Sequence, residues 1–514
     1  LVITIIVLLI LAGVTIVALS GDNGILTRAS ESKGKTEKAQ EKEGVELAVT
    51  SIRIEDMNTL EISKEKLENA IRQQFGNSKD FDVIDNKDGS FLVNMNDTKR
   101  MYYVDGTGLV IAEENMLKIS TPEELNTFRN DVNSGNTYKG WYVYLVNDIT
   151  LDINKEWEPI GLYLMENSTP ADESNKPFSG IFDGNGYEIN GLYINTSDKA
   201  QGLFGLVTNG IVKNIGIGEN SNITGGAATA GLIGYIYNGS TISNCYNETD
   251  IVGTGNNIGG VVGAAYINCK IINVYNTGDV KNSNSYSGGV AGLINNNVYI
   301  QNSYNTGLVN GENRVGGIAG NSIGNTFIED CYNEGVVTGK TLIAGICGYT
   351  DEGANINQCY NAGNINATDM NDYGNSNVGG IVGLNYAKVT NCYNKGSIEG
   401  KFNNIGGLIG ANSGLLRNSY NIGNISGTAE LIGGLVGNNS ETNTEQSVNK
   451  GEIYNSYSLE GISEKLYGGN SSVIGEECSL KTNSELQNLY TTLGDSFKED
   501  KNNKNNGYPI LEWQ

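Results

Sequence analysis

Histidine is absent from this chain of 514 residues, and proline is scarce, with five residues. Without histidine, the protein cannot use His-based general acid–base catalysis, Ser-His-Asp or Cys-His nucleophiles, or the common histidine zinc sites. Basic residues are in the minority, with 34 Lys and Arg against 58 Asp and Glu, for a net charge of −24. This balance argues against sequence-independent nucleic-acid binding, which needs a basic face.

Glycine is abundant instead, with 69 residues, and asparagine is frequent throughout the chain. Because both residues tolerate positive φ, this composition favours short strands joined by tight turns. The hydrophobic fraction of 38% argues against wholesale disorder, and the shortage of proline excludes a collagen-like chain. A chain of this length allows about three domains, unless an internal repeat builds one long domain.

The N-terminal segment 1–19, LVITIIVLLILAGVTIVAL, carries no charge. As a helix it would span about 29 Å, close to one hydrocarbon thickness, and it is apolar on all sides. We expect it to lie in lipid or among other apolar helices. Helix formers with interspersed charges follow at 28–49, so we expect one helix of about 50 residues, weakened locally at Gly34 and Gly44. An ordinary signal anchor or an uncleaved secretory signal would share this apolar character.

The first 49 residues resemble the N-terminus of type IV pilins and pilin-like proteins, and Ala12 to Ile16 (AGVTI) matches a bacterial subgroup of them. The resemblance implies that a leader peptidase removes a short basic leader, and that the helix leaves the membrane to pack with its copies in a filament core. Leu1 stands where the best-known pattern has Phe, and Ile5 where many pilins carry Glu. Either a few residues before Leu1 are absent, or this subgroup assembles without that charge pair. The residues expected to pack in the filament core are Leu1, Val2, Ile3, Ile5, Ile6, Val7, Leu8, Leu9, Ile10, Leu11, Val14, Ile16, Val17 and Leu19.

A small head is expected next. Residues 60–75 have helical spacing, with Ser63 as a candidate N-cap. Residues 81–111 contain three strand-like runs separated by Asp-Gly turns, which predicts an antiparallel meander packed on the long helix. This arrangement resembles the reduced globular part of a pilin. Three aspartates of this region fit turn positions better than a calcium cluster; they are Asp85, Asp88 and Asp97.

Two phased motifs repeat through the rest of the chain. The motif G-Φ-Φ-G, in which Φ is mostly apolar, recurs from 202–205 to 434–437, and successive closing glycines are 27 to 35 positions apart. A second motif that ends in Tyr-Asn, such as NCYN at 244–247, follows about 12 residues later. One repeat is too short to bury a core alone but suits one coil of a β-solenoid, in which repeated asparagines bond from coil to coil and repeated tyrosines stack. The tyrosines expected to form this ladder are Tyr246, Tyr275, Tyr304, Tyr332, Tyr360, Tyr393 and Tyr420.

These repeats resemble the GLUG-motif repeats of bacterial surface proteins. The flanking segments EWEPIG (156–161) and GYPILEW (507–513) extend the resemblance to about 119–514. The expected fold class is therefore an all-β solenoid, a β-helix of GLUG-type repeats, preceded by a long pilin-like N-terminal α-helix and a small α+β head. The expected parts are the helix 1–50, the head 51–118, a leading solenoid segment 119–200, the repeat solenoid 201–455 and a closing segment 456–514.

Four of the seven cysteines share one repeat position, which other copies fill with valine or serine; they are Cys245, Cys331, Cys359 and Cys392. This interchange favours packed interior thiols, although a disulfide between Cys331 and Cys359 on adjacent coils stays open. The chain contains no C-x-x-C pair, so neither a zinc nor an iron–sulfur site is expected. We expect no metal and no cofactor.

Acidic residues supply weak catalytic candidates. The string Asp183-Gly184-Asn185-Gly186 resembles part of a calcium loop, but no downstream Glu completes it, so a turn is favoured. Asp250, Asp279, Glu329 and Asp330 could form a glycosidase pair on a solenoid groove, yet no repeat breaks the pattern to build one cleft. An insertion near 367–377 could form a surface loop with a binding role.

These observations together predict a structural subunit of an extracellular type IV pilus-like filament, and not an enzyme. The subunit would be inserted in the membrane before assembly, would polymerise with copies of itself, and would display its solenoid for adhesion or another surface interaction. Glycans or other surface ligands are candidate partners, and nucleic acid is not expected. The alternatives are a membrane-anchored monomeric surface adhesin and a solenoid carbohydrate-active enzyme.

Overall fold

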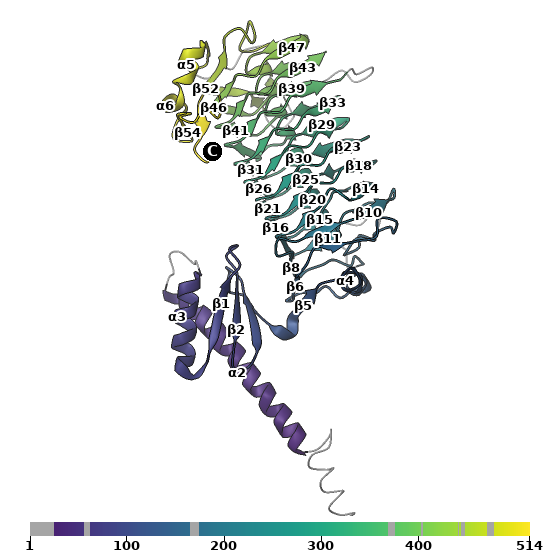
Figure 1. The fold of residues 1–514 in the computed structure, drawn as a ribbon. Coiled ribbons are helices and arrows are strands. Elements are labelled where there is room, and N and C mark those ends of the chain that lie inside the picture. Colours follow the sequence, from purple (N-terminus) through teal and green to yellow (C-terminus); the bar gives the residue numbers. More distant parts are fainter. Residues whose placement is uncertain are drawn as a thin grey trace, which may run out of the picture. The chain divides into compact units, whose positions relative to one another are not determined.

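A computed structural model describes residues 25–55, 62–164, 174–368, 376–401, 404–439, 441–443, 448–469 and 477–514 (Figure 1). The chain divides into two compact units, Leu1–Leu117 and Lys118–Gln514. The apolar segment 1–19, with all its predicted filament-core residues, lies outside the described residues, and so does most of the insertion near 367–377.

The first unit is built on helix α2 (Ile25–Glu55), which runs without a break through both glycines that were expected to weaken it. An added Cβ at Gly34 would meet no atom within 4 Å, whereas one at Gly44 would lie 2.2 Å from the Phe75 ring. Gly44 therefore lets the following helix approach closely, which outweighs its low helix propensity. Among the described helices, none is long and apolar enough to cross a membrane.

Helix α3 (Lys64–Phe75) and a four-stranded antiparallel meander complete this unit. The Ser63 hydroxyl accepts a hydrogen bond from the Lys66 backbone N–H, which confirms the predicted N-cap. The strands pair in sequence order and are β1 (Phe81–Asp85), β2 (Phe91–Met95), β3 (Arg100–Val104) and β4 (Val110–Ala112). One apolar core joins α2, α3 and the meander. The predicted packing of a meander on the long helix is thus confirmed.

Glu41 of α2 is buried in this core, with a side chain 1% exposed. Its carboxylate accepts hydrogen bonds from Lys79 Nζ at 2.9 Å, Thr98 Oγ1 at 3.0 Å and Tyr102 Oη at 3.0 Å. The Arg100 guanidinium lies 3.6 Å away. A buried carboxylate is tolerated only with such partners, so this network fixes how the meander is registered against the helix.

Replacing Glu41 with glutamine should destabilise the first unit by about 3 kcal/mol at pH 7, because buried donors would then face a neutral group. Burial alone would raise the pKa of Glu41, but hydrogen bonds from Lys79, Thr98 and Tyr102 outweigh it and hold that pKa below its ordinary value. The stabilisation is therefore complete above the unfolded pKa of about 4.3, and is lost as the pH falls through the lower, folded pKa. Calorimetry of the full chain at pH 7 and pH 3 should show the wild-type advantage shrinking on acidification.

The matched control is Glu43→Gln, because Glu43 is exposed on the same helix. This variant should unfold within about 0.5 kcal/mol of the wild type at both pH values. A difference between wild type and Glu41→Gln that does not change with pH would contradict the role given to the Glu41 carboxylate.

The second unit is a stack of parallel β-coils that begins with β5 (Met116–Ile119) and helix α4 (Pro122–Ser134). The α4 residue Phe128 packs on Phe178 and Phe182 of the first coils, with ring centroids 5.7 and 5.9 Å apart. The Thr121 hydroxyl caps the helix N-terminus. Helix α4 thereby covers apolar side chains of the first coil, which no preceding coil would shield.

Each coil contributes short strands to shared columns of parallel pairs. The first column is β6 (Tyr142–Leu145), β8 (Ile181–Asp183), β12 (Ile211–Lys213), β16 (Thr241–Ser243), β21 (Lys270–Ile272), β26 (Tyr299–Gln301), β31 (Phe327–Glu329), β36 (Asn355–Asn357), β41 (Lys388–Thr390), β46 (Leu415–Asn421) and β52 (Glu452–Leu459). The second, in the same sheet, is β7 (Ile149–Thr150), β9 (Glu188–Asn190), β13 (Gly216–Ile217), β17 (Tyr246–Asn247), β22 (Tyr275–Asn276), β27 (Tyr304–Asn305), β32 (Tyr332–Asn333), β37 (Tyr360–Asn361) and β42 (Tyr393–Asn394), continued by β46, β52 and β53 (Ser479–Lys481).

Three further sheets close the coils. One contains β10 (Tyr193–Asn195), β14 (Asn222–Gly225), β18 (Ile251–Gly253), β23 (Val280–Asn282), β28 (Val309–Asn310), β33 (Val337–Gly339), β38 (Ile365–Ala367), β43 (Ile398–Lys401) and β47 (Ile425–Thr428). The next contains β19 (Ile258–Gly259), β24 (Ser285–Gly288), β29 (Asn313–Gly316), β34 (Ile343–Ala344), β39 (Asn377–Gly379), β44 (Asn404–Gly406) and β48 (Leu431–Gly433). The G-Φ-Φ-G motifs lead into the last, which contains β11 (Phe204–Thr208), β15 (Ile233–Tyr237), β20 (Val262–Tyr266), β25 (Ala291–Asn295), β30 (Ala319–Ile323), β35 (Cys347–Thr350), β40 (Val382–Asn385), β45 (Ile409–Asn412) and β49 (Val436–Asn439). The predicted β-solenoid is therefore confirmed.

The C-terminal segment leaves this pattern after an antiparallel hairpin of β50 (Glu441–Asn443) and β51 (Val448–Lys450) and the return strand β52. It folds as short elements beside β46 and β52 (Figure 1). These elements are α5 (Asn483–Gln487), α6 (Tyr490–Leu493), β54 (Phe497–Lys498) and β55 (Ile510–Leu511). The sequence patterns did not predict the two short helices.

Candidate functional site

The seven tyrosines of the predicted ladder lie in register on adjacent coils. Successive rings are stacked, with centroids 4.9 to 5.1 Å apart and planes within 9° of each other. The spacing follows from the parallel pairing of the strands that carry them, because neighbouring strands lie about 4.8 Å apart. In the same register, β52 adds an eighth tyrosine, Tyr457, opposite Tyr420. The sequence NSYS at 455–458 carried this signal, although it lacks the final asparagine of the motif.

The asparagine that follows each tyrosine points into the solenoid and forms a second ladder. Each side-chain amide donates to the asparagine Oδ1 of the next coil, over distances of 2.8 to 2.9 Å, from Asn247 to Asn421. The same Nδ2 atoms also donate to a backbone carbonyl two residues further on. Apart from Asn247 Oδ1 at its start, this ladder satisfies completely buried polar groups, and it ties together the seven coils that carry Asn247 to Asn421.

The residue two positions before each tyrosine has a left-handed backbone, with φ between +50° and +55° from Asn244 to Asn418. Asparagine occupies most of these positions because it tolerates this conformation better than other side-chain-bearing residues. The residue type at this position therefore explains the left-handed turn before each tyrosine. On neighbouring coils, Asn244 donates to Asn214, and Asn273 donates to Asn244.

The four cysteines that share a repeat position are buried and unpaired. Burial raises the pKa of the Cys245 thiol to about 12, and it raises the pKa of Cys359 strongly, helped by the neighbouring thiols Cys331 and Cys392. The Cys245 and Cys359 thiols therefore stay protonated at neutral pH. All four buried cysteines act as small apolar core side chains. The packed-thiol interpretation is confirmed, and the open alternative, a disulfide between Cys331 and Cys359, is not formed.

The C-terminal segment covers one half of the tyrosine ladder. Its apolar side chains pack on Tyr360, Tyr393, Tyr420 and Tyr457, which we call the covered tyrosine row; the packing residues include Leu486, Leu489, Leu493, Phe497, Tyr508 and Leu511. The Trp513 ring lies 6.2 Å from Tyr332 and 5.9 Å from Tyr360, and its Nε1 donates to the Gln358 carbonyl at 3.0 Å. The closing segment is thus a cover for the ladder, which its sequence did not predict.

The C-terminal segment does not extend over the other half of the ladder, although Tyr332 packs at the edge of its apolar cluster. We call Tyr246, Tyr275, Tyr304 and Tyr332 the open tyrosine row; all four are partly exposed. The Tyr246 hydroxyl donates to Glu188 at 2.6 Å, and its ring lies over Gly216, where a Cβ would lie 2.1 Å from it. The open row is therefore bounded by Glu188 at one end and by Trp513 at the other.

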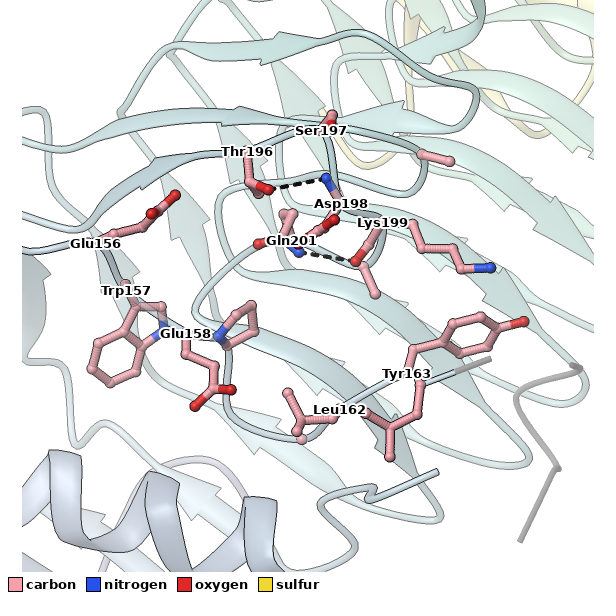
Figure 2. Close-up of a pocket in the computed structure, with 15 residues that line it drawn as sticks. Glu156, Trp157, Glu158, Leu162, Tyr163, Thr196, Ser197, Asp198, Lys199 and Gln201 are labelled. Atoms are coloured by element: carbon pink, nitrogen blue, oxygen red, sulfur yellow. Dashed lines mark hydrogen bonds between the residues drawn. The ribbon is translucent and has the colours of Figure 1, made fainter. Parts of the chain in front are cut away.

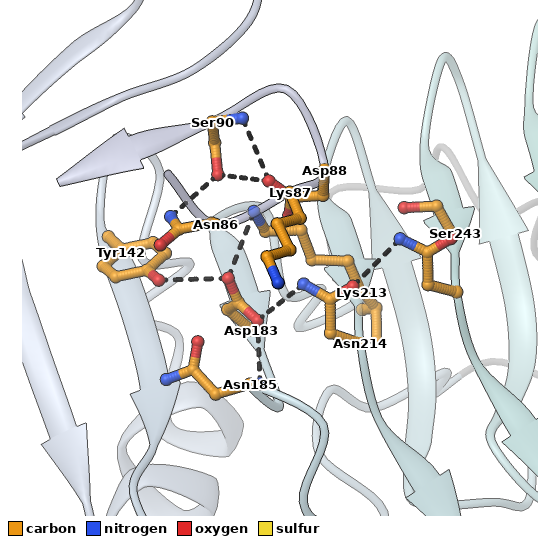
Figure 3. A network of polar contacts seen from close by, with 12 residues as sticks. Asn86, Lys87, Asp88, Ser90, Tyr142, Asp183, Asn185, Lys213, Asn214 and Ser243 are labelled. Atoms are coloured by element: carbon orange, nitrogen blue, oxygen red, sulfur yellow. Dashed lines mark hydrogen bonds and ion pairs between the residues drawn. The ribbon is translucent and has the colours of Figure 1, made fainter. Parts of the chain in front are cut away.

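The carboxylate candidates serve the fold. Asp183 is completely buried, pairs with Lys213 at 3.1 Å, and accepts hydrogen bonds from Tyr142 at 3.0 Å and Asn214 at 3.0 Å (Figure 3). It also accepts from the backbone N–H of Asn185 at 2.8 Å, and Asn185 has a φ of +51°. The predicted turn at 183–186 is therefore confirmed.

The predicted turn roles in the head are also confirmed. Asp85 accepts from the Lys87 backbone N–H, and Asp88 accepts from that of Ser90. Asp97 accepts from the backbone N–H of Asp80. In the parts of the chain that the structure describes, no group of three or more Cys, Asp or Glu side chains could hold a metal ion.

The four glycosidase candidates divide between two columns of the solenoid. Asp250 accepts from the Asp279 backbone N–H at 2.9 Å, and Asp279 accepts from that of Leu308 at 3.2 Å, so these two aspartates link successive coils. Glu329 ends strand β31 and accepts from Asn357 Nδ2 at 2.8 Å. Burial and the adjacent Glu329 raise the pKa of Asp330.

A cleft of about 960 Å³ lies on the leading coils (Figure 2). The segment EWEPIG contributes Glu156, Trp157 and Glu158 to it, and Lys199 crosses it with its Nζ 4.9 Å from the Tyr163 ring centroid. Trp157 is 4% exposed and donates to the Leu203 carbonyl, so it supports the coil rather than offering a binding face. Leu164 also lines the cleft, and residues 165–173 after it lie outside the described residues.

Comparison with known proteins supports the repeat assignment. The family model of the GLUG motif matches residues 254–281 and 374–399. A protein of Evansella cellulosilytica, provisionally named a Gly-rich membrane protein, is 35% identical over 112 residues, which are 20% of this chain and 11% of that protein. The chain thus spans about a tenth of the length of this relative.

Among solved structures, a chain from Bacteroides ovatus, provisionally named an immunoglobulin A1 protease, aligns with a TM-score of 0.32 and 20% identity. The alignment covers 80% of this chain and 97% of that chain. The match of the family model confirms the resemblance of the repeats to the GLUG motif, whereas the pilin resemblance of residues 1–49 stays a prediction.

Proposed function

We propose that this chain is a structural subunit of an extracellular, type IV pilus-like filament, with a role in adhesion or another surface interaction and no enzymatic activity. It would polymerise through its apolar N-terminal segment and display the acidic solenoid. The observation that carries this proposal is the extension of α2 beyond the core of its own head, directly after that apolar segment.

The core of the head uses only the second half of α2, from Glu41 to Ile52. Residues 31–40 are all exposed or partly exposed. Residues 31–40 of the helix therefore extend about 15 Å without joining a described core. A helix of this kind suits packing against something outside its own head, which supports a contact with neighbouring subunits.

The outer face of α2 offers a second support. Leu47 and Ile54 are 48% and 65% exposed, and they lie on one face of the helix because they are seven residues apart. Large apolar side chains at such exposed positions are suited to an interface. In a filament, this face would be covered by the helices of neighbouring subunits.

Burial of the apolar segment among its copies would hold assembled subunits together outside the membrane, against charge repulsion between acidic subunits. Relative to exposure to water, the fourteen large apolar side chains predicted for the filament core would contribute about 20 kcal/mol at roughly 1.5 kcal/mol each. This exceeds the cost of ordering subunits and of screened repulsion between exposed charges at physiological salt.

The test is Leu9→Asp, with Leu9→Ile as the matched control. The aspartate should abolish filaments in electron micrographs of sheared surface material, because a charge cannot be buried without a partner in the helical core. Circular dichroism should still show the folded solenoid, and the isoleucine variant should form filaments in normal yield. Filaments of normal yield from Leu9→Asp would refute the proposal.

The same segment could instead anchor a monomeric surface adhesin, and the name of the Evansella relative, a membrane protein, favours this second candidate. The two functions differ in how wild-type protein leaves the cell. Long fibres released by shear support the filament, whereas single molecules released only by detergent support the anchor.

A further inference from the structure

We propose that the open tyrosine row, together with Trp513, is a binding site for a neutral, linear glycan. This inference deepens the adhesive role and rests on the proposed function for the place where the ligand is met. It assigns the ligand class and the residues that contact it.

The geometry of the row selects a periodic ligand. The ring planes are nearly parallel, so the faces of each ring stack on the neighbouring tyrosines. A ligand can therefore contact only the ring edges and the hydroxyls. Within the described residues, the hydroxyls of Tyr275 and Tyr304 have no hydrogen-bond partner, and these rings are 5.0 Å apart. A linear glycan presents hydroxyls at a similar interval, because one extended pyranose unit has about this length.

The covered tyrosine row shows what these hydroxyls bind. Tyr393 and the Gln514 carboxamide exchange hydrogen bonds of 3.0 and 3.1 Å. The Tyr420 hydroxyl donates to the Pro509 carbonyl and accepts from Asn505 Nδ2 at 2.7 Å. Each partner is uncharged and polar, as sugar hydroxyls are. The open row offers the same hydroxyls on the next coils, without the cover.

The margins beside the two central tyrosines, Tyr275 and Tyr304, are polar and uncharged, whereas Glu248 and Glu334 take the corresponding positions on the two outer coils. Asn273 and Asn302 are exposed on one side, and Thr277 and Thr306 are exposed on the other. These side chains can donate and accept hydrogen bonds on both sides of the tyrosines, so the polar surface is wider than the row itself. A ligand rich in hydroxyls matches such a surface better than an apolar helix does.

The electrostatics exclude a polyanionic glycan. Glu188 bonds Tyr246 at one end of the row, and the field of Glu248 reaches Tyr275 and Tyr304. Burial is the main cause that raises the pKa of both tyrosines. The Tyr304 phenol and then Glu248 and Glu188 add to the effect on Tyr275, and Glu248 and Glu334 add to it on Tyr304, so both hydroxyls stay protonated donors at neutral pH. With a net charge of −24 on the chain, a carboxylated or sulfated polymer would be repelled.

Trp513 forms an aromatic wall at the end of the row. Its ring is nearly equidistant from Tyr332 and Tyr360 and within 25° of their planes, so it lies beside the two rings with its faces directed along the row. The residue is 37% exposed, which leaves ring surface for a ligand. The apolar face of a sugar ring can pack on such a surface while its hydroxyls meet the tyrosines.

The experiment measures binding of the full chain, purified in detergent, to cellohexaose, mannohexaose, xylohexaose and a hyaluronan hexasaccharide by calorimetry. The double variant Tyr275→Phe/Tyr304→Phe removes two hydroxyls and keeps the stacked rings. It should weaken binding of a neutral sugar by about tenfold or more, the effect of two lost hydrogen bonds. Trp513→Ala should also weaken binding. The matched control is Tyr299→Phe, because Tyr299 is 40% exposed on the same coil but stacks on Phe327 outside the row.

Binding of a neutral hexasaccharide that falls in the row variants and not in Tyr299→Phe supports the proposal. Absence of binding to all three neutral sugars, equal binding by the double variant, or preference for the hyaluronan fragment overturns it. A change of oligomeric state in the double variant without any sugar binding would instead make the row a contact between copies. Filaments are scored separately by electron microscopy, so sugar binding by a protein that forms no filaments would refute the filament and leave the glycan site standing.

Discussion

Replacing Asn305 with alanine should destabilise the solenoid by about 3 to 5 kcal/mol. Asn305 is completely buried, and its Oδ1 accepts from Asn276 at 2.8 Å. Its Nδ2 donates to the Gly307 carbonyl at 2.7 Å and to Asn333 Oδ1 at 2.9 Å. Alanine would leave a donor and two acceptors without partners in a site that water cannot reach, and would also interrupt the ladder between two coils.

Guanidinium denaturation of the full chain, followed by far-ultraviolet circular dichroism, measures this loss as a lower midpoint. The matched control is Thr306→Ala, because Thr306 is exposed in the adjacent position of the same coil. That variant should unfold within about 0.5 kcal/mol of the wild type. Equal midpoints for the two variants would mean that the asparagine ladder does not hold the coils together.

The repeats show how far the sequence predicts this fold. The period, the parallel stacking and the two ladders follow from the positions of glycine, asparagine and tyrosine. The contact between the two motifs could not be predicted from these positions. An added Cβ at the first glycine of a G-Φ-Φ-G motif would touch the ladder asparagine of the same coil, 2.2 Å away for Gly260 and Asn276, and 2.3 Å away for Gly289 and Asn305. The motifs are phased because each asparagine packs on a bare glycine.

The candidate site was predicted only in part. The tyrosine ladder follows from periodicity, but its division into an open and a covered half depends on the C-terminal segment. Trp513 contacts Tyr332, which lies 181 residues earlier in the sequence, and no period relates the two. A single-copy contact of this kind leaves no repeat signal. For the same reason, the turn residues of the leading coils were identified, but the ion pair of Asp183 with Lys213 was not.

In the head, local patterns predicted the elements but not the buried charge. Ser63 predicts the start of α3, and the Asp-Gly pairs predict the turns of the meander. Glu41 stands among exposed charges of α2 in the sequence and is distinguished only by partners from distant strands, such as Tyr102. Gly44 similarly looks like a weak point in a helix, and only the position of Phe75 explains it.

Gly317→Ala should prevent normal stacking of its coil and destabilise the solenoid by at least about 3 kcal/mol. A Cβ at this position would lie 2.2 Å from the carbonyl oxygen of Gly345 and 2.3 Å from Asn333 Cγ. The carbonyl belongs to the next coil, and the asparagine is held on both sides by the ladder. Neither group can move without breaking parallel pairing, so a single methyl group separates two coils and disturbs the ladder at once.

The control for this steric argument is Gly34→Ala, where an added Cβ meets no atom within 4 Å. In the exposed helix interior, alanine should match or raise stability, by up to about 1 kcal/mol, because it favours helix over the unfolded chain. Calorimetry of the two variants should show opposite changes, with the loss for Gly317→Ala confined to the solenoid transition. A Gly317→Ala protein that unfolds like the wild type would mean that the coils can move apart by the width of a methyl group, and the close packing of glycine on asparagine would then not explain why the two motifs are phased.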